Sequence, residues 1–348
     1  MNFLSLRAFV ICFFLLFQSA VINAQTNSSS GYHVITKHTL GGEGGWDYLT
    51  VDAQAHRVYI SRSTHVMVVN EDSGQTIGDI PNTNGVHGIA LVPEFGKGFT
   101  SNGRDSTVTV FDLKTLKVLS QIAVGKNPDA ILYDPFSKRV LTMNGASRDA
   151  TAIDAKTGTV AGTIALDGKP EFAVSDERGH VYVNLEDRSI VAELDPRGLK
   201  VEARWPIAPG EEPTGLAIDR KHRRLFAGCS NKLMVVLSAD DGHVIKSLPI
   251  GSGVDATAFD PETQLAFSSN GGDGTLTVIH EDSPESFTVI DNVATQRGAR
   301  TMALDAKTHR IYLVTAEFGP TPAPTAERPR PRPSIVPGTF TLLIVGRS

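Results

Sequence analysis

The chain repeats one pattern seven times, and this repetition restricts its fold more than any other feature of the sequence. Each unit contains a turn followed by a short apolar run, as in "GKNPDAILYDP" from Gly125 to Pro135. Further short apolar runs follow within each unit, and turn residues separate them. Four short strands in a unit of roughly 40 residues are typical of a propeller blade. The sequence therefore predicts an all-β fold, a seven-bladed β-propeller.

One position of the unit keeps its place but changes its residue type. It lies at the start of the first apolar run, and successive copies are 40, 42, 42, 43, 41 and 45 residues apart. The seven residues at this position are Asp47, His87, Asp129, Glu171, Thr214, Asp255 and Arg300. Because the first strand of each blade lines the central channel, we expect these side chains to meet around one opening of the channel.

The two ends of the chain predict how the ring of blades closes. The seventh unit has no fourth run, and its third run is "TFTLLIV" from Thr339 to Val345. The run "YHVITKHTL" from Tyr32 to Leu40 stands before the first unit. Pairing of these two runs would complete the last blade and remove two exposed strand edges. We therefore expect the N-terminal strand to pair with the C-terminal blade.

The segment "SNGRDSTVTVFDLKTLKVLSQIAVGKNPDAILYDP" from Ser101 to Pro135 resembles the YVTN-type repeat of exported, YncE-like β-propeller proteins. The resemblance extends through all seven units. That repeat usually has Pro two residues before Gly, as in Pro213–Gly215, whereas "PDA" and "PEF" stand there in two units. The resemblance implies the propeller fold and export. It implies no single reaction, because a shared fold does not carry a shared chemistry.

The first 24 residues have the pattern of a secretory signal peptide. Arg7 supplies a positive charge, residues 8–17 form a short apolar run, and "INA" precedes Gln25. An uncleaved membrane anchor is the alternative, but the apolar run is short for a membrane span. We expect residues 1–24 to be a signal peptide and residues 25–348 to form the propeller domain. The mature protein would then be periplasmic or secreted, with no membrane span.

The overall charge argues against a nucleic acid as the partner. The chain has 33 Lys and Arg residues against 38 Asp and Glu residues, a formal net charge of −5. Proteins that bind nucleic acids usually present a basic face. We therefore expect the partner to be a small molecule or a protein that binds at the channel face.

The order of charges around the expected ring singles out two carboxyl groups. Arg300 and His87 both flank Asp47, whereas Asp129 and Glu171 are neighbours with no positive ring residue between them. Two carboxylates about 8 Å apart at an effective dielectric constant near 20 repel each other by roughly 2 kcal/mol. One of this pair should therefore have a raised pKa, as a general acid or base requires. Asp129 and Glu171 are the candidate catalytic residues.

A second set of polar residues is expected beside the ring, where the second strand of each blade ends. The candidate ligand-binding residues are accordingly Asp47, His87, Asp129, Glu171, Asp255, Arg300, Asn102, Asn144 and Asn270. Carboxylate and amide oxygens would suit a divalent cation such as calcium, but the sequence does not identify a cofactor. The alternative is that these side chains bind only water and loop amides.

Three functions remain open at this point. The first is an exported propeller that binds a small ligand, an ion or a partner on the polar face of its channel. The second is a metal-dependent, lactonase-like hydrolase that uses the channel carboxylates. The third is an accessory role in quinone-dependent oxidation. "AIDAKTG" (Ala152 to Gly158) resembles the blade-docking pattern of quinoprotein dehydrogenases, but Gly162 stands in place of its Trp.

The segment from Glu317 to Gly338 is rich in proline and separates the second and third runs of the last unit. Proline excludes helix, so the segment should be an extended loop on the ring side of the propeller. Its positive charges are Arg328, Arg330 and Arg332. It could be a lid that partly neutralises the ring, or merely a solvated connector.

Overall fold

The computed structural model describes residues 30–325, residue 331 and residues 333–347. The expected signal peptide therefore lies outside the described residues, as do Arg328, Arg330 and Arg332. Within the described part of the chain, no helix is both long enough and apolar enough to cross a membrane.

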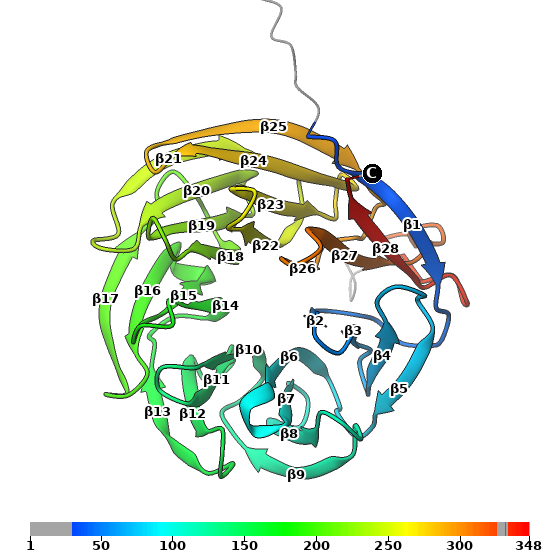
Figure 1. Ribbon diagram of the computed structural model, residues 1–348, viewed down its shortest axis with the longest axis horizontal. Coiled ribbons are helices and arrows are strands. Elements are labelled where there is room, and N and C mark those ends of the chain that lie inside the picture. Colours follow the sequence, from blue (N-terminus) through cyan, green and yellow to red (C-terminus); the bar gives the residue numbers. More distant parts are fainter. Residues whose placement is uncertain (1–29, 326–330, 332, 348) are drawn as a thin grey trace, which may run out of the picture.

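Seven four-stranded antiparallel sheets surround a central channel, and Figure 1 shows them as the blades of a propeller. The predicted fold is confirmed. Blade 1 consists of β2 (Leu49–Asp52), β3 (Arg57–Ser61), β4 (Val66–Asn70) and β5 (Thr76–Ile80). Blade 2 consists of β6 (Val86–Val92), β7 (Lys97–Asn102), β8 (Thr107–Asp112) and β9 (Val118–Ala123), and blade 3 of β10 (Pro128–Asp134), β11 (Arg139–Asn144), β12 (Asp149–Asp154) and β13 (Val160–Ala165).

The remaining blades repeat this arrangement. Blade 4 consists of β14 (Pro170–Ser175), β15 (Val181–Leu185), β16 (Ile190–Asp195) and β17 (Lys200–Pro206), and blade 5 of β18 (Pro213–Asp219), β19 (Arg224–Cys229), β20 (Leu233–Ser238) and β21 (Val244–Pro249). Blade 6 consists of β22 (Val254–Asp260), β23 (Leu265–Asn270), β24 (Thr275–Ser283) and β25 (Ser286–Ala294). Two short 3-10 helices, η1 (Pro93–Phe95) and η2 (Glu186–Arg188), lie in turns of blades 2 and 4.

Blade 7 combines the two ends of the chain, as the sequence predicts. It consists of β26 (Met302–Asp305), β27 (Arg310–Thr315), β28 (Thr341–Gly346) and, at its outer edge, β1 (His33–Thr39). β1 pairs with β28 in antiparallel register over six residue pairs, from His33 opposite Gly346 to Thr39 opposite Thr341. This strand pairing closes the ring of blades, because the N-terminal strand supplies the fourth strand that the C-terminal blade lacks.

The hydrophobic core lies in the gaps between neighbouring blades. Phe226 of blade 5 packs against Phe259 and Phe287 of blade 6, with ring centroids 5.1 Å and 5.8 Å apart. The second strands β19 and β23 are wholly buried, whereas the outer strand β9 is exposed along most of its length. Each blade therefore depends on its neighbours for burial of its apolar faces.

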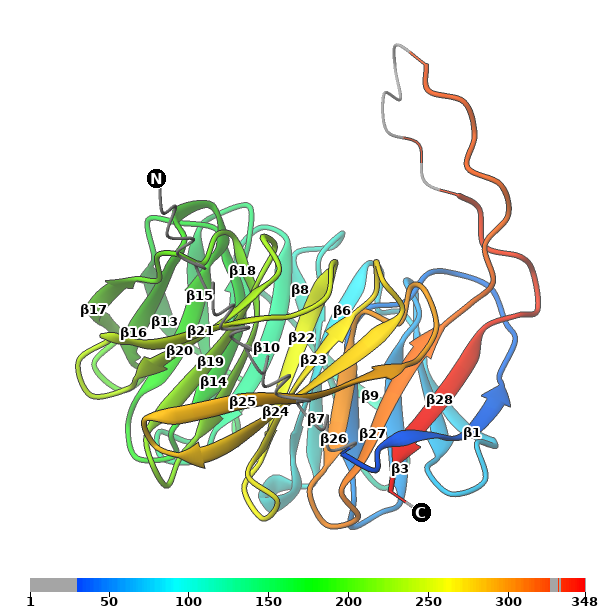
Figure 2. The ribbon, with the colours of Figure 1, turned by 90° about the horizontal axis from the view of Figure 1, so that it is seen from above.

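The proline-rich segment stands on the side of the propeller where the innermost strands begin. Its base is held by a bridge between Phe318 and Ile335, and the Gly319 amide donates to the Ser334 carbonyl at 2.9 Å. Figure 2 shows that its described parts rise away from the body of the propeller. The expected side is right, but these parts do not lie across the channel as a lid would.

Candidate functional site

Irregular strand pairing positions most of the ring residues. The register between β10 and β11 shifts between Pro128 and Ile131, and Asp129 lies within this shift. The innermost strands β6, β14, β18 and β22 have the same shift. The residues within those shifts are His87, Glu171, Thr214 and Asp255. A β-bulge redirects a side chain locally. The same bulge therefore orients the ring residue in each of these five blades.

Buried hydroxyl groups hold the backbone of the ring. The Asp47 amide donates to Ser61 Oγ at 2.9 Å. Ser101 Oγ donates to the Asp129 carbonyl, and Ser269 Oγ donates to the Arg300 carbonyl. These bonds engage main-chain atoms of Asp47, Asp129 and Arg300, so they place these three residues without occupying their side chains.

The asparagines at the ends of the second strands do not form a second polar ring. Asn102, Asn144 and Asn270 are fully buried. Each donates through Nδ2 to the threonine seven residues later, at 2.8, 2.9 and 2.8 Å. This corrects the prediction that they bind ligand, because their amides are used inside their own blades and do not reach the channel.

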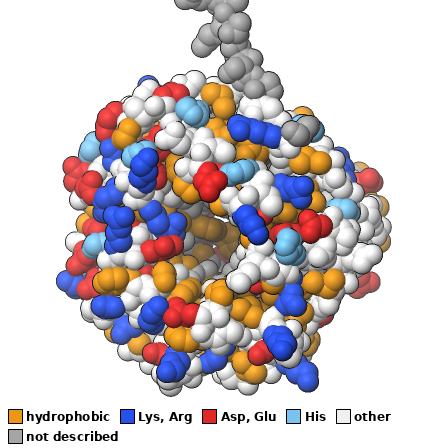
Figure 3. Space-filling view, in the orientation of Figure 1, with side chains coloured by type: hydrophobic (Ala, Val, Ile, Leu, Met, Phe, Trp, Pro, Cys, Tyr) orange, Lys and Arg blue, Asp and Glu red, His pale blue; other side chains and the backbone are white. Residues whose placement is uncertain are grey.

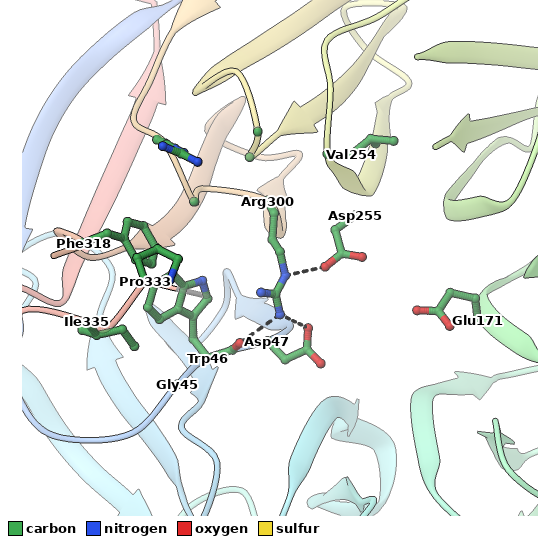
Figure 4. Close-up of a pocket in the computed structure, with 15 residues that line it drawn as sticks. Gly45, Trp46, Asp47, Glu171, Val254, Asp255, Arg300, Phe318, Pro333 and Ile335 are labelled. Carbon is green, nitrogen blue, oxygen red and sulfur yellow. Dashed lines mark hydrogen bonds and ion pairs between the residues drawn. The ribbon is translucent and has the colours of Figure 1, made fainter. Parts of the chain in front are cut away.

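Arg300 joins two of the ring carboxylates. Its Nε donates to Asp255 Oδ2 at 2.5 Å, and its Nη2 donates to Asp47 Oδ1 and the Trp46 carbonyl, both at 3.1 Å. Figure 4 shows the guanidinium between the two carboxyl groups. Burial opposes the charge of Arg300, but the two carboxylates raise its pKa above the usual range.

His87 continues this network into blade 2. Its Nδ1 lies 2.6 Å from Asp47 Oδ2 and 3.6 Å from Asp129 Oδ1. Burial alone would lower the pKa of His87, but the bond to Asp47 and the charges of Asp129 and Asp47 raise it to about 9. His87 is therefore cationic at neutral pH, and Asp47 lies between two positive groups.

The pKa values of the other ring carboxyl groups are raised. Burial raises the pKa of Glu171 to about 8, and the neighbouring Asp129 adds to the rise. Burial likewise raises the pKa of Asp129 to about 6, although His87 opposes it, and burial raises the pKa of Asp255 despite Arg300. We call Asp129, Glu171 and Asp255 the acidic arc. The predicted rise at the Asp129–Glu171 pair is present in both carboxyl groups.

The sequence analysis did not identify Lys169 as a cation near the acidic arc. Lys169 Nζ lies 3.3 Å from Glu171 Oε2, and the same ammonium also forms an ion pair with Glu186. The Asp129–Glu171 pair is therefore not as isolated from positive charge as expected. The signal was available, because residues i and i+2 of an extended chain point to the same side. Glu186 takes part of this charge, which leaves the pKa of Glu171 raised.

Two aromatic side chains, those of Tyr48 and Phe172, directly follow the ring residues Asp47 and Glu171 in the chain. Tyr48 of blade 1 meets Phe172 of blade 4 across the channel, edge to face, with ring centroids 5.3 Å apart. Burial and the surrounding carboxylates raise the pKa of Tyr48 well above its usual range. Figure 3 shows the opposite face, which is hollowed at the centre of the ring and has hydrophobic side chains in the hollow. Tyr48 and Phe172 therefore make an apolar contact across the channel beside the charged residues.

A cavity of about 710 Å³ opens at this end of the channel. Its charged side chains are those of Asp47, Glu171, Asp255, Arg297 and Arg300. Its apolar side carries Trp46, Phe318, Pro333 and Ile335, which we call the apolar wall. The volume is within the range of sites for small molecules. Five of the nine predicted ligand-binding residues lie outside the lining of this cavity: His87, Asp129, Asn102, Asn144 and Asn270.

Two of these five residues could hold a metal beside the cavity, together with Asp47. One ligand atom each from Asp47, His87 and Asp129 lies within 4.8 Å of the others. An imidazole with two carboxylates suits zinc or a similar transition metal, whereas calcium prefers oxygen ligands. The donor set therefore does not favour the calcium that the sequence suggested.

The packing at Gly162 bears on the quinoprotein-like pattern. A Cβ atom at Gly162 would lie 2.5 Å from Leu199 Cδ1. Leu199 of the next blade occupies the space into which a larger side chain would extend. The blade-to-blade stacking of a Trp at this position has no room here.

The sequence matches no protein-family model and no curated relative. The structure is similar to solved β-propellers. The Kuenenia stuttgartiensis hydrazine synthase is 14% identical, with a TM-score of 0.69, over 77% of this chain and 92% of that chain. U3-55K is 7% identical, with a TM-score of 0.72, over 90% and 98%. The RRP9 WD40 repeats are 7% identical, with a TM-score of 0.73, over 91% and 98%. At these identities the likeness shows the fold alone.

Proposed function

We propose that the protein is an exported, YncE-like propeller that binds a small cationic ligand at the acidic arc. One observation carries this proposal. Burial, with repulsion by other carboxylates, raises the pKa values of Asp129, Glu171 and Asp255 despite the nearby cations. A bound positive charge would relieve this imbalance. At an effective dielectric constant near 20, a cation 4 Å from one carboxylate gains about 4 kcal/mol of attraction.

Asp47 and Asp255 already have cationic partners. Arg300 bridges Asp47 and Asp255, and His87 contacts the second oxygen of Asp47. Asp129 and Glu171 are therefore the carboxyl groups of the acidic arc that Arg300 does not contact, on the side of the channel away from it. This is where the ligand's positive group should bind.

Cation binding should be coupled to proton release. Glu171, with a pKa of about 8, carries a proton at neutral pH, and a cation beside it favours the ionised form. The affinity for methylammonium should therefore rise about tenfold between pH 7 and pH 9, where the amine itself stays protonated. A Glu171→Gln variant should lose this pH dependence and bind more weakly at pH 9.

Isothermal titration with methylammonium chloride at both pH values tests the proposal, and the exposed Glu211→Gln serves as the control. Proton release is measured by comparing buffers of different ionisation enthalpy. Affinity that is independent of pH, or equal in the wild type and Glu171→Gln, would contradict cation binding at the acidic arc.

Export rests on the first 24 residues and on the resemblance of the repeats to exported propellers. Expression with the full N-terminus should give a periplasmic or secreted protein that begins near Gln25. Mass spectrometry of the intact protein from each cell fraction measures this. A cytoplasmic protein that retains residues 1–24 would contradict export.

A metal-dependent hydrolase is the second candidate, favoured by the convergence of Asp47, His87 and Asp129. These residues would hold the metal, which would supply Lewis-acid chemistry when bound. Glu171, with its raised pKa, could hold a proton near that site. Elemental analysis after dialysis, with lactone hydrolysis before and after zinc addition, tests this candidate. Stoichiometric metal with turnover that Asp129→Asn abolishes would favour it, whereas no metal uptake would exclude it.

A further inference from the structure

Building on the proposed cation binding, we infer that the ligand is an organic amine with an apolar body. Its ammonium group would bind at the acidic arc, and its body would pack against the apolar wall of Trp46, Phe318, Pro333 and Ile335. The chemical class is thus an amine that carries an aromatic or branched aliphatic group.

The apolar wall is built before any ligand arrives. Trp46 packs against Phe318 with ring centroids 6.1 Å apart, and against the buried Phe340 at 5.5 Å. The Arg62 guanidinium in turn packs over the Phe340 ring, 3.5 Å from its centroid. The bridge between Phe318 and Ile335 fixes two members of the wall relative to each other. A preformed wall lowers the entropy cost of binding an apolar group.

The opposite side of the cavity offers a buried acceptor. Glu171 is only 9% exposed, and its Oε2 accepts no hydrogen bond from the described part of the protein. Lys169 Nζ lies 3.3 Å away, but without the geometry of a hydrogen bond. Figure 4 shows the Glu171 carboxyl group pointing into the cavity, toward Asp255. The carboxyl group lines the cavity, so an ammonium group there can lie beside Glu171.

Two arginines line the cavity, Arg297 and Arg300, and Arg300 lies between these two sides. Asp47 and Asp255 both pair with its guanidinium, which therefore presents a planar and largely neutralised group to the cavity. Figure 4 shows the order from Phe318 and Ile335, through Arg300, to Glu171. An elongated ligand can therefore contact the wall with one end and Glu171 with the other.

The size of the cavity favours an organic amine over a bare ion as the ligand. A volume of about 710 Å³ exceeds what a metal ion or methylammonium would fill. A small ion would leave the apolar wall in contact with water, whereas an amine with an apolar body would cover it. Burial of apolar surface would then add affinity that a bare ion cannot gain.

Three probes of similar size or charge test the inference: 2-phenylethylamine, methylamine and the uncharged 2-phenylethanol. We expect 2-phenylethylamine to bind at least about tenfold more tightly than methylamine, which is the effect of burying roughly half of a phenyl group. Phe318→Ala should remove most of this advantage and leave methylamine binding unchanged. Ile335→Ala gives a second variant of the wall. Phe136→Ala is the matched control, because Phe136 is a partly exposed phenylalanine elsewhere on the surface.

The outcomes separate the two proposals. Equal affinity for 2-phenylethylamine and methylamine, or wall variants that bind both amines like the wild type, would overturn the role of the apolar wall and leave cation binding intact. Binding of 2-phenylethanol as tight as that of 2-phenylethylamine would overturn the need for an amine. Failure of both amines to bind would overturn cation binding itself.

Discussion

Glu171→Gln should make the protein more stable, and the gain should grow with pH. Glu171 lies almost wholly buried at the acidic arc, and burial together with Asp129 raises its pKa from 4.5 to about 8. In the unfolded chain this carboxyl group ionises near its usual value. Between these two pH values the folded protein therefore binds more protons than the unfolded chain.

The sign and size of the effect follow from this difference. The free energy of unfolding should fall as the pH rises from about 4.5 to about 8, because the unfolded chain releases the Glu171 proton more readily. Each tenfold difference in proton affinity is worth about 1.36 kcal/mol, so ionised Glu171 destabilises the fold by up to about 5 kcal/mol. Glutamine cannot ionise. The variant should match the wild type at pH 4.5 and exceed it increasingly up to pH 9.

Urea unfolding at pH 4.5, 7 and 9, followed by tryptophan fluorescence, measures the effect. The exposed Glu211→Gln should show no comparable gain at any pH. A Glu171→Gln protein that is less stable than the wild type at pH 9, or whose difference from it does not change with pH, would refute the reasoning. Saturating 2-phenylethylamine should narrow the gap at pH 9, because it stabilises the ionised form of Glu171 in the wild type.

Three further predictions concern the frame and the ring. Deletion of His33–Thr39 should prevent stable folding, because it removes the outer strand of blade 7; a deletion protein with the parent's melting temperature would contradict ring closure. Asn144→Ala should reduce the free energy of unfolding by about 1–3 kcal/mol, the cost of unpaired buried groups, and leave methylammonium affinity unchanged; a loss of affinity at unchanged stability would restore its role as a ligand. Asp47→Asn should lower the pKa of His87 from about 9, which NMR titration of the imidazole protons measures; an unchanged pKa would contradict the Asp47–His87 pairing.

The sequence predicts the blades and their closure because these depend on features that repeat. Alternating apolar runs and turns set the strands, and a missing fourth run leaves one place for the strand from His33 to Thr39. The ring is equally predictable, because one position per repeat lies within two residues of the start of the innermost strand. The bulges that contain His87, Asp129, Glu171 and Asp255 recur for the same reason.

The content of the site is less predictable, because it depends on contacts between different blades. Tyr48 and Phe172 are separated by more than 120 residues, and only the closed ring brings their side chains together. Phe318 and Ile335 belong to a long connection whose path has no repeat to guide it. The asparagines misled the sequence reasoning because a polar residue at a strand end can serve either the channel or its own blade.

The way the frame is held together supports the proposal that the acidic arc is a binding site. Ser101 and Ser269 bind the carbonyl groups of ring residues, and the strand ladders hold each blade together, so these contacts support the frame without using the side chains of Asp129 and Glu171. Buried carboxyl groups with raised pKa values destabilise the fold when they ionise. Apolar or amide side chains at Asp129 and Glu171 would avoid this loss. A local feature that opposes stability, in a cavity with a preformed apolar wall, is characteristic of a functional site. A cationic ligand beside Glu171 would offset this loss of stability by favouring the ionised form.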